Sequence, residues 1–292
     1  MANSTAIPES YSSLPVKDIL ISHVPETCLS PTVVLLQLNR PKKLNAVTAQ
    51  MIEELVTAYH YFELDDRVKA IVVTGVGKGF CVGADLGVGF SGLLENLKGG
   101  PPAINAYRDG GGRVALAIHN CPTIRVVSAN SKIGFAFSRR GLVMEACSSY
   151  FLPRLLGLSR ALHLVTTGGT YAASDPLLAQ LFSEVLPTPE ETVSRAIEIA
   201  NEIAAHTSTV STAVMHDLMC RGPSTPEEAH LLESRIFLTT LLSRDSKEGM
   251  ASFLEKRNPR FTGTMRKDAP QGWPWWQTTD TTSHIGENKT KL

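Results

Sequence analysis

Two short stretches of this sequence hold residue types that could act on a polarised carbonyl group. In KGFCVGADL (78–86), the small residues Gly83 and Ala84 would let backbone N–H groups face a cleft and stabilise an oxyanion. In GLVMEACSS (141–149), Glu145 stands among apolar residues. A carboxyl group in such a setting holds its proton more readily, which suits a general acid or base. The plainer interpretations are a glycine-rich turn and a carboxylate that interacts with a helix dipole.

The cysteines and histidines do not favour other chemistry. The five cysteines show neither a CxxC pattern nor a Cys/His metal spacing, and the eight histidines show no pair at ligand spacing on a helix face. We therefore expect no metal centre, and reduced thiols in an intracellular compartment. As nucleophiles, Cys81 and Cys147 would lack a histidine or aspartate relay. The cysteines are Cys28, Cys81, Cys121, Cys147 and Cys220.

The composition excludes several classes of partner. The chain has 292 residues, 43% of them hydrophobic, which is enough for a sizeable buried core. Lys and Arg together number 28, as do Asp and Glu, so the overall charge does not favour nucleic acid or an anionic membrane. No apolar run approaches the ~18 residues of a membrane span. The N-terminus shows neither a basic nor an apolar signal region, which excludes a secretory signal.

The final tripeptide, Thr290-Lys291-Leu292, bears on localisation. It is similar to the Ser-Lys-Leu signal that a receptor reads for peroxisomal import, although Thr departs from the preferred small residues. We therefore expect a peroxisomal protein. The alternative is a cytoplasmic protein whose tail ends in these residues by chance.

The first third of the chain predicts a strand, a helix and a second strand. Residues 32–38 (TVVLLQL) and 68–74 (VKAIVVT) are apolar and β-branched, as in buried strands. Thr48 is a plausible N-cap for the intervening helix. Apolar residues then recur at helical spacing at Met51, Leu55, Ala58, Tyr59 and Phe62. This order indicates an α/β fold.

The remainder divides into three parts. The rest of the α/β core, to residue 188, contains a glycine-rich loop followed by further short helices and strands. Amphipathic helices occupy 189–265, and 266–292 is a Pro- and Thr-rich tail that we expect to be loosely ordered. Its Trp273, Trp275 and Trp276 could dock on the body or on a partner. In the core we expect a loop at 86–102, helices at 113–119, 148–155 and 159–166, and strands at 124–128 and 132–137.

Four ordered motifs carry a resemblance to a known family. LQLNRPKKLNAVTAQMIEEL, DDRVKAIVVTGVGKGFCVGADL, KIGFAFSRRGLVMEACSSYFLPRLLG and KEGMASFLEKR together resemble the crotonase superfamily of enoyl-CoA hydratases and isomerases, over most of residues 17–262. The resemblance implies a spiral of ββα units with a C-terminal helical trimerisation region, in a homotrimer or a dimer of trimers. It also implies acyl-CoA thioester substrates and no separate cofactor.

The resemblance assigns roles to particular residues. The N–H of Ala84, within Gly83-Ala84-Asp85, matches the first oxyanion donor. Phe253 and Lys256 match residues that close over CoA, often from a neighbouring subunit; the plainer interpretation is helix packing and a surface charge. The segment that resembles the family's CoA-binding loop includes Lys42, Lys43 and Ala46.

Glu145 is most similar to the catalytic glutamate of peroxisomal Δ3,Δ2-enoyl-CoA isomerases, where small residues follow it. The resemblance implies that this carboxylate takes a proton from C2 of a 3-enoyl-CoA and returns it to C4. Two-glutamate hydratases have an acid near the position of FAFSRR (135–140), where this chain has none. This favours isomerase over hydratase. Fatty-acid β-oxidation and a specialised-metabolite pathway both stay open.

The sequence also departs from the family at Pro122–Ile124. In the family a strand, a glycine-rich turn with the second oxyanion N–H, and a helix follow the position of Asn120-Cys121-Pro122. This chain continues directly to Ile124, so ~25 residues are absent, a whole strand-and-helix unit. Loss of one oxyanion donor costs about 100- to 1000-fold in rate. An inactive acyl-CoA-binding or trimer-forming relative is therefore the alternative to an enzyme; the neutral charge disfavours an RNA-binding relative.

Overall fold

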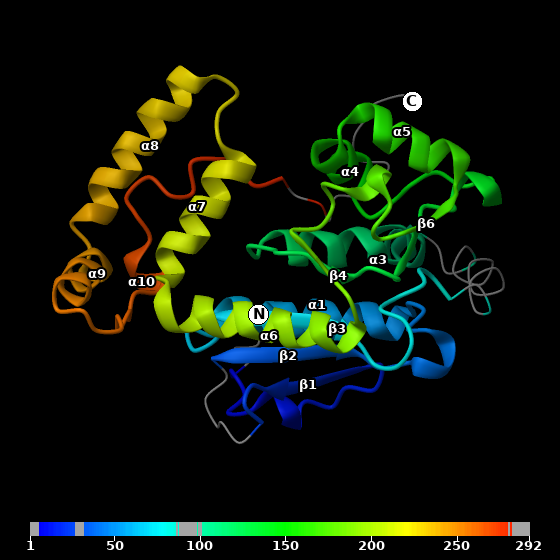
Figure 1. Cartoon of the computed structure of the whole chain (residues 1–292), viewed down its shortest axis with the longest axis horizontal. Helices are drawn as coiled ribbons and strands as arrows, with labels where there is room; N and C mark the ends of the chain where they lie inside the picture. Colours follow the sequence, from blue (N-terminus) through cyan, green and yellow to red (C-terminus); the bar gives the residue numbers. More distant parts are fainter. Residues whose placement is uncertain are drawn as a thin grey trace.

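The N-terminal part of the chain contains a three-stranded sheet (Figure 1). The computed structural model describes residues 6–26, 32–85, 87, 98, 101–279 and 281, and for 101–107 the backbone alone. The strands are β1 (Ile19–His23), β2 (Val33–Leu38) and β3 (Ala70–Gly75). β1 is antiparallel to β2 and β3 is parallel to it, so β2 is the central strand.

Helices cover both faces of β2, which explains its continuous apolar sequence. On one face, Val34 and Leu36 join a buried core with α1 (Ala49–Leu64). On the other face, Val33 packs with Ala200 and Ala204 of α6 (Pro189–His206). Successive side chains of a strand point to opposite faces, so both faces of β2 must be apolar.

α1 begins and packs as the sequence predicts. The Thr48 side chain accepts a hydrogen bond from the Met51 N–H at 3.0 Å and caps the helix. All five apolar residues predicted to share a helix face are buried. The predicted N-cap and core face of this helix are therefore confirmed.

α3 (Pro101–His119) is longer than the predicted helix at 113–119. Three consecutive glycines lie within it, and each would ordinarily weaken a helix by about 1 kcal/mol. Close packing explains the first of them, because a Cβ at Gly110 would lie 3.0 Å from Cδ1 of Ile52 on α1. Most of the predicted loop at 86–102 lies outside the described residues.

The second half of the core contains short strand pairs and two helices. β4 (Val126–Ser128) pairs in parallel with β7 (Glu184–Leu186), and β5 (Lys132–Gly134) pairs antiparallel with β6 (Thr170–Ala172). The strand predicted at 132–137 therefore ends three residues early, and a 3₁₀ turn begins at Ser138. The helices are α4 (Ser148–Leu156) and α5 (Leu158–Thr167). The 3₁₀ turns of the described chain are Tyr11–Ser13, Pro41–Lys43, Ser138–Arg140 and Pro176–Leu178.

β3 and β4 are not hydrogen-bonded to each other within the described residues. β3 pairs with β2 alone and β4 with β7 alone, yet α6 packs against both β3 and β4. β3 is also less buried than its sequence predicts, since Val72 is its single fully buried residue. The outer edge of β3 therefore has no strand neighbour in the part of the chain that the structure describes.

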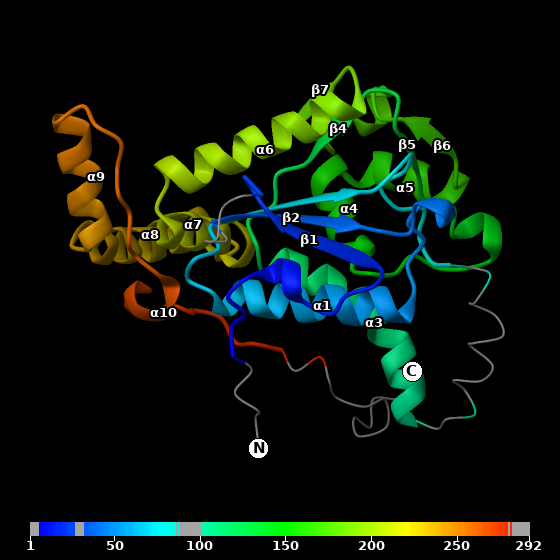
Figure 2. The same ribbon diagram turned by 90° about the horizontal axis from the view of Figure 1, so that it is seen from below.

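The C-terminal part is helical, as predicted. α7 (Thr209–Arg221), α8 (Pro226–Leu241), α9 (Arg244–Leu254) and the short α10 (Met265–Asp268) follow α6. α8 and α9 lie at the opposite end of the molecule from α4 and α5 (Figures 1 and 2). Among the described residues, no helix is both long and apolar enough to cross a bilayer.

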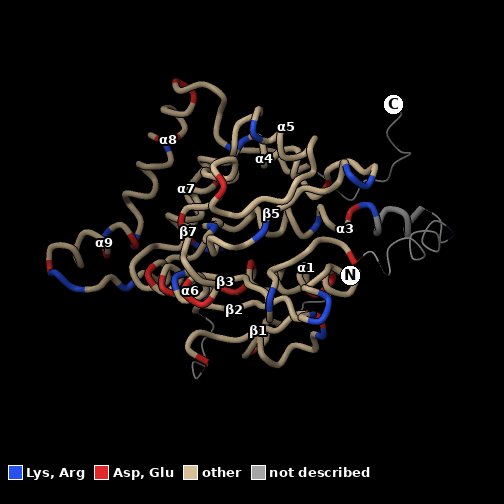
Figure 3. The backbone as a smooth tube through the Cα atoms, turned by 45° about the vertical axis from the view of Figure 1, so that its right-hand side comes forward, with Lys and Arg blue, Asp and Glu red and all other residues tan. Residues whose placement is uncertain are grey.

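The described part of the tail is docked rather than loose. Trp273 Nε1 donates a hydrogen bond to Asp217 on α7 at 2.8 Å, and Trp275 Nε1 donates to the Arg221 carbonyl at 3.0 Å. The Arg221 guanidinium lies over the Trp276 ring, 4.5 Å from its centroid. Basic and acidic residues are interspersed along the chain rather than separated onto two faces (Figure 3).

Candidate active site

A buried asparagine joins the two loops that form one half of the candidate site. Asn45 is fully buried and adopts a left-handed backbone conformation, with φ of 56°. Its amide Nδ2 donates to the carbonyls of Val76 at 3.0 Å and Gly79 at 2.7 Å, and its Oδ1 accepts from the Arg40 N–H at 2.7 Å. The predicted CoA-binding segment and the glycine-rich turn after β3 are thus held together.

Backbone pairing fixes the direction of the Ala84 N–H. The Val47 N–H donates to the Gly83 carbonyl at 2.8 Å, and the Asp85 N–H donates to the Val47 carbonyl at 3.0 Å. The N–H of Ala84 therefore points away from Val47, because alternate residues of an extended segment face opposite sides. Ala84 is exposed, and no described residue accepts a hydrogen bond from its N–H. Within the described residues, this N–H is therefore available to an acceptor such as the expected oxyanion.

An ion pair secures the same turn. Arg40 donates through Nη2 to Asp85 Oδ2 at 2.9 Å and through Nη1 to the Ala46 carbonyl at 2.5 Å. Hydrogen bonding from Arg40 lowers the pKa of the Asp85 carboxyl group. Asp85 and Ala46 are therefore supports of the loop in this chain, and Ala46 is itself buried.

The predicted CoA-binding lysines are accessible. Lys42 and Lys43 are exposed on the 3₁₀ turn after β2. A shallow surface depression beside them is lined by residues 39–43. Point charges of this kind suit a phosphate.

Glu145 lies on a strained turn against α3, and its predicted apolar burial is wrong. The side chain is exposed, and its apolar neighbour Val143 is itself 86% exposed. The next two residues, Ala146 and Cys147, both adopt left-handed conformations, with φ of 52° and 57°. Such conformations cost about 1–3 kcal/mol each and concentrate at functional sites. The turn sets the Glu145 carboxylate against α3, where a Cβ at Gly111 would lie 2.9 Å from Oε1.

The structure does not bring all the predicted site residues together. No hydrogen bond joins Glu145 to the Gly83–Asp85 turn among the described residues. Helix α3 lies near both parts of the candidate site. It packs on α1, the helix that follows the first loop, and it approaches Glu145. Phe253 is 81% exposed at the end of α9, and Lys256 is exposed with φ of 53°. Both belong to the helical end of the molecule, away from α4.

One cluster was missed by the sequence analysis. His119, His216 and Cys220 have potential ligand atoms within 4.8 Å of one another. The expectation that no Cys/His metal spacing occurs is wrong, because His216 and Cys220 are one helical turn apart on α7. The four-residue spacing of His216 and Cys220 is visible in the sequence and could have indicated this pair. No sequence pattern indicated His119, because it belongs to a distant helix.

Fold and site together define a class of protein. Mixed α/β layers, an Ala84 N–H with no acceptor among the described residues and one exposed carboxylate are consistent with the resemblance to the crotonase superfamily. The model of the enoyl-CoA hydratase/isomerase family matches residues 29–97 and 102–264, and the chain belongs to this family.

Known proteins agree with this assignment. The chain is 42% identical to an enoyl-CoA hydratase, AKT3-2, of Alternaria alternata, over 82% of this chain and 86% of that protein. It is 34% identical to a mitochondrial enoyl-CoA hydratase of Pongo abelii, over 79% and 83% of the two chains. A crystal structure of a putative enoyl-CoA hydratase from Streptomyces coelicolor A3(2) superposes with a TM-score of 0.75 at 23% identity, over 90% and 98%. The predicted fold class is thus confirmed.

Proposed function

We propose that this chain is built for double-bond isomerisation of an enoyl-CoA thioester, with Glu145 as the acid/base. One observation carries the proposal: residues 135–140 (FAFSRR), where a two-glutamate hydratase has an acid, contain none, and Glu145 is the acidic residue next to them. A hydratase that uses two carboxylates needs an acid at that position, whereas an isomerase needs one carboxylate. The accessible Glu145 carboxylate and the free Ala84 N–H support the same chemistry.

The reaction needs one proton carrier and no exchange of electrons with another molecule. Glu145 would take a proton from C2 of a 3-enoyl-CoA, and the electrons of that C–H bond would form a dienolate. The Ala84 N–H would stabilise the negative charge on the thioester oxygen. Glu145 would then return the proton to C4, which leaves the double bond between C2 and C3 and regenerates the carboxylate.

The substrate's CoA portion would be held by two copies of the chain. Lys42 and Lys43 suit its phosphates, while Phe253 and Lys256 would close over CoA from a neighbouring subunit. The exposed large apolar side chains of α8 and α9 support a trimer or dimer of trimers, because exposed apolar patches mark protein–protein contacts. These side chains include Leu231, Phe237, Leu238, Leu242, Met250, Phe253 and Leu254.

We further propose that a strand-and-helix unit is absent between Pro122 and Ile124. The unpaired outer edge of β3, with β4 on the same helix α6, supports a missing strand between them. The alignment to the Alternaria alternata relative also supports it. That alignment spans 262 positions but only 82% of this chain, or about 239 of its 292 residues, so the relative has residues without a counterpart here.

Two other functions have specific support. The relatives carry the name enoyl-CoA hydratase, which favours hydration of a 2-enoyl-CoA. The absent unit favours an acyl-CoA-binding relative without activity, because the second oxyanion donor would lie in it. The product formed, or binding of the CoA ester without any product, distinguishes these functions.

The decisive experiment compares two forms of the protein. The chain itself, and a form with the corresponding segment of the Alternaria alternata relative inserted after Pro122, would be given a 3-enoyl-CoA and a 2-enoyl-CoA. We expect the conjugated 2-enoyl product from the first substrate, at a rate at least 100-fold higher in the extended form. Glu145→Gln should lower this rate by about 100- to 10,000-fold. Hydration alone, or no turnover by either form, would contradict isomerisation; CoA-ester binding without turnover would identify the inactive relative.

We also propose peroxisomal import through Thr290-Lys291-Leu292, which lie outside the described residues. A fluorescent protein fused in front of the tail should enter peroxisomes and should stay in the cytoplasm when the three residues are removed. Cytoplasmic location of both fusions would contradict the proposal and favour the cytoplasmic alternative.

A further inference from the structure

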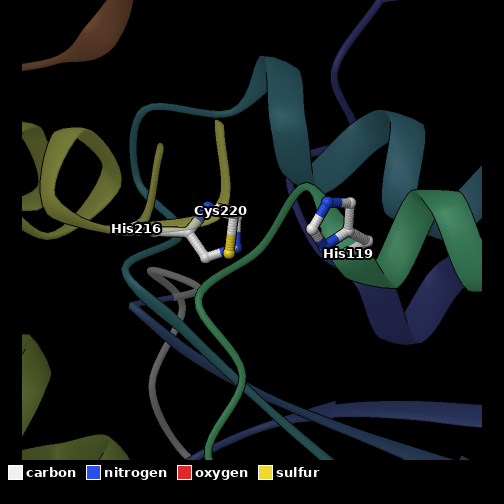
Figure 4. Close-up of side chains that lie close together, drawn as sticks. All are labelled: His119, His216 and Cys220. Atoms are coloured by element: carbon white, nitrogen blue, oxygen red, sulfur yellow. Dashed lines mark hydrogen bonds between the residues drawn. The ribbon is translucent and has the colours of Figure 1, made fainter. Parts of the chain in front are cut away.

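The ends of α3 and α7 meet outside the candidate active site. His119 is the last residue of α3, and His216 and Cys220 project from α7 toward it (Figure 4). Their potential ligand atoms all lie within 4.8 Å of one another. We propose that these three side chains bind a Zn²⁺ ion, with a fourth position open to water.

The geometry of the α7 pair fits this metal. Cys220 Sγ lies 3.5 Å from His216 Nε2. With Zn–N and Zn–S bonds of about 2.0 and 2.3 Å, a tetrahedral site separates such a pair by about 3.5 Å. Two imidazole nitrogens and one thiolate select zinc over magnesium or calcium, which prefer oxygen ligands.

The surroundings favour a cation despite one nearby positive charge. α3 ends at His119 and α7 ends at Arg221, so the negative ends of two helix dipoles converge here. Arg221 would repel the ion, but its guanidinium is paired with Asp217 on the same helix.

The ligands are held in place by their neighbours. His216 Nδ1 lies 3.4 Å from Asp217 Oδ1, which leaves Nε2 for the metal, a common arrangement around zinc. Arg221 Nη2 donates to Asn120 Oδ1 at 2.8 Å and so ties the residue after His119 to α7. His216 is buried, His119 partly buried and Cys220 exposed, which gives the ion a path from solvent.

A bound ion would connect three parts of the fold. It would link α3 in the core to α7 in the helical part, beside the tail residue Trp273, which bonds to Asp217. None of the three ligands belongs to the candidate acyl-CoA site. The inference is thus independent of the proposed isomerase function.

The test uses the full chain, with Zn²⁺ and Co²⁺ as probes. All three tryptophans of the chain lie at 273–276, so intrinsic fluorescence reports on this region alone. We expect one equivalent of Zn²⁺ to bind and to raise the melting temperature. Co²⁺ should quench the tryptophan fluorescence and show a thiolate-to-cobalt charge-transfer band in the near ultraviolet.

Paired variants decide whether these ligands are used. Cys220→Ser should abolish the charge-transfer band, and both it and His216→Asn should weaken Zn²⁺ binding at least tenfold. Cys121→Ser and His230→Asn should bind as the unmodified chain does, since Cys121 packs on the α1 core and His230 is exposed on α8. Circular dichroism verifies that each variant is folded. Absence of saturable Zn²⁺ binding by the folded chain, or binding unchanged by both ligand substitutions, would overturn the proposal.

Discussion

Gly111 on α3 and Glu145 on the turn before α4 are so close that a methyl group at Gly111 would lie 2.9 Å from Glu145 Oε1. The adjacent Gly112 has nothing within 4 Å of a Cβ. A side chain at Gly111 would therefore contact the proposed base, whereas one at Gly112 would not.

This pair gives a prediction about the base. Gly111→Ala should displace the Glu145 carboxylate and lower isomerase kcat on the order of tenfold to a hundredfold, because small misplacements of catalytic groups have effects of this size. Gly112→Ala should leave kcat unchanged. Either substitution favours the helix by about 0.5–1 kcal/mol. Equal kcat values for the two variants would count against Glu145 as the base.

Asn45 should be the residue on which the oxyanion loop depends for its stability. Asn45→Ala would leave two carbonyl groups and one N–H without their partners in a buried site, and should lower the free energy of unfolding by about 2–4 kcal/mol. Asn201→Ala, at an exposed position on α6, should change it by less than about 0.5 kcal/mol. Urea denaturation measures both. A similar effect of the two substitutions would show that the hydrogen bonds of Asn45 contribute little.

Asp65 should make the stability depend on pH. Burial opposes its charge, but hydrogen bonds from Arg67 and Tyr11 outweigh this and lower the pKa of Asp65 below its ordinary value of 3.8. A lowered pKa in the folded state stabilises the protein above about pH 4, and the effect is lost as the pH falls through the folded-state value.

Asp65→Asn should therefore lower the free energy of unfolding by about 2 kcal/mol at neutral pH, and by progressively less as the pH falls. Asp66→Asn, at the exposed neighbouring position, should have little effect at either pH. Urea unfolding of both variants across this pH range checks the sign. A destabilisation by Asp65→Asn that grows on acidification would be the opposite of the expected result.

The outer edge of β3 should exchange its amide hydrogens rapidly. Amides of Ala70–Gly75 that point away from β2 have no strand partner among the described residues. Inserting the relative's segment after Pro122 should slow their exchange by at least 100-fold, because each would gain a hydrogen bond. The amides that bond to β2 serve as the internal reference. Unchanged protection of the outer edge would mean that the segment does not pair with β3.

Local patterns predicted the fold well where one element carries its own signal. The apolar run of β2, the Thr48 cap and the spacing of Met51 to Phe62 reflect burial and capping that depend on nearby residues. The exposure of Glu145 could not be predicted, because it depends on which other surfaces cover its turn. The proximity of His119 to Cys220 depends on the packing of helices that are far apart in sequence.

The packing of α6 on both β3 and β4 has a consequence for assembly. Helix α6 follows the proposed insertion point in sequence and contacts both β3 and β4, so it sets the spacing of these two strands. Each strand can therefore keep its place whether or not residues are inserted between them. The chain would then behave as the larger piece of a complementation pair. A separate peptide with the relative's segment, added in solution, could rebuild the sheet without being covalently joined to it.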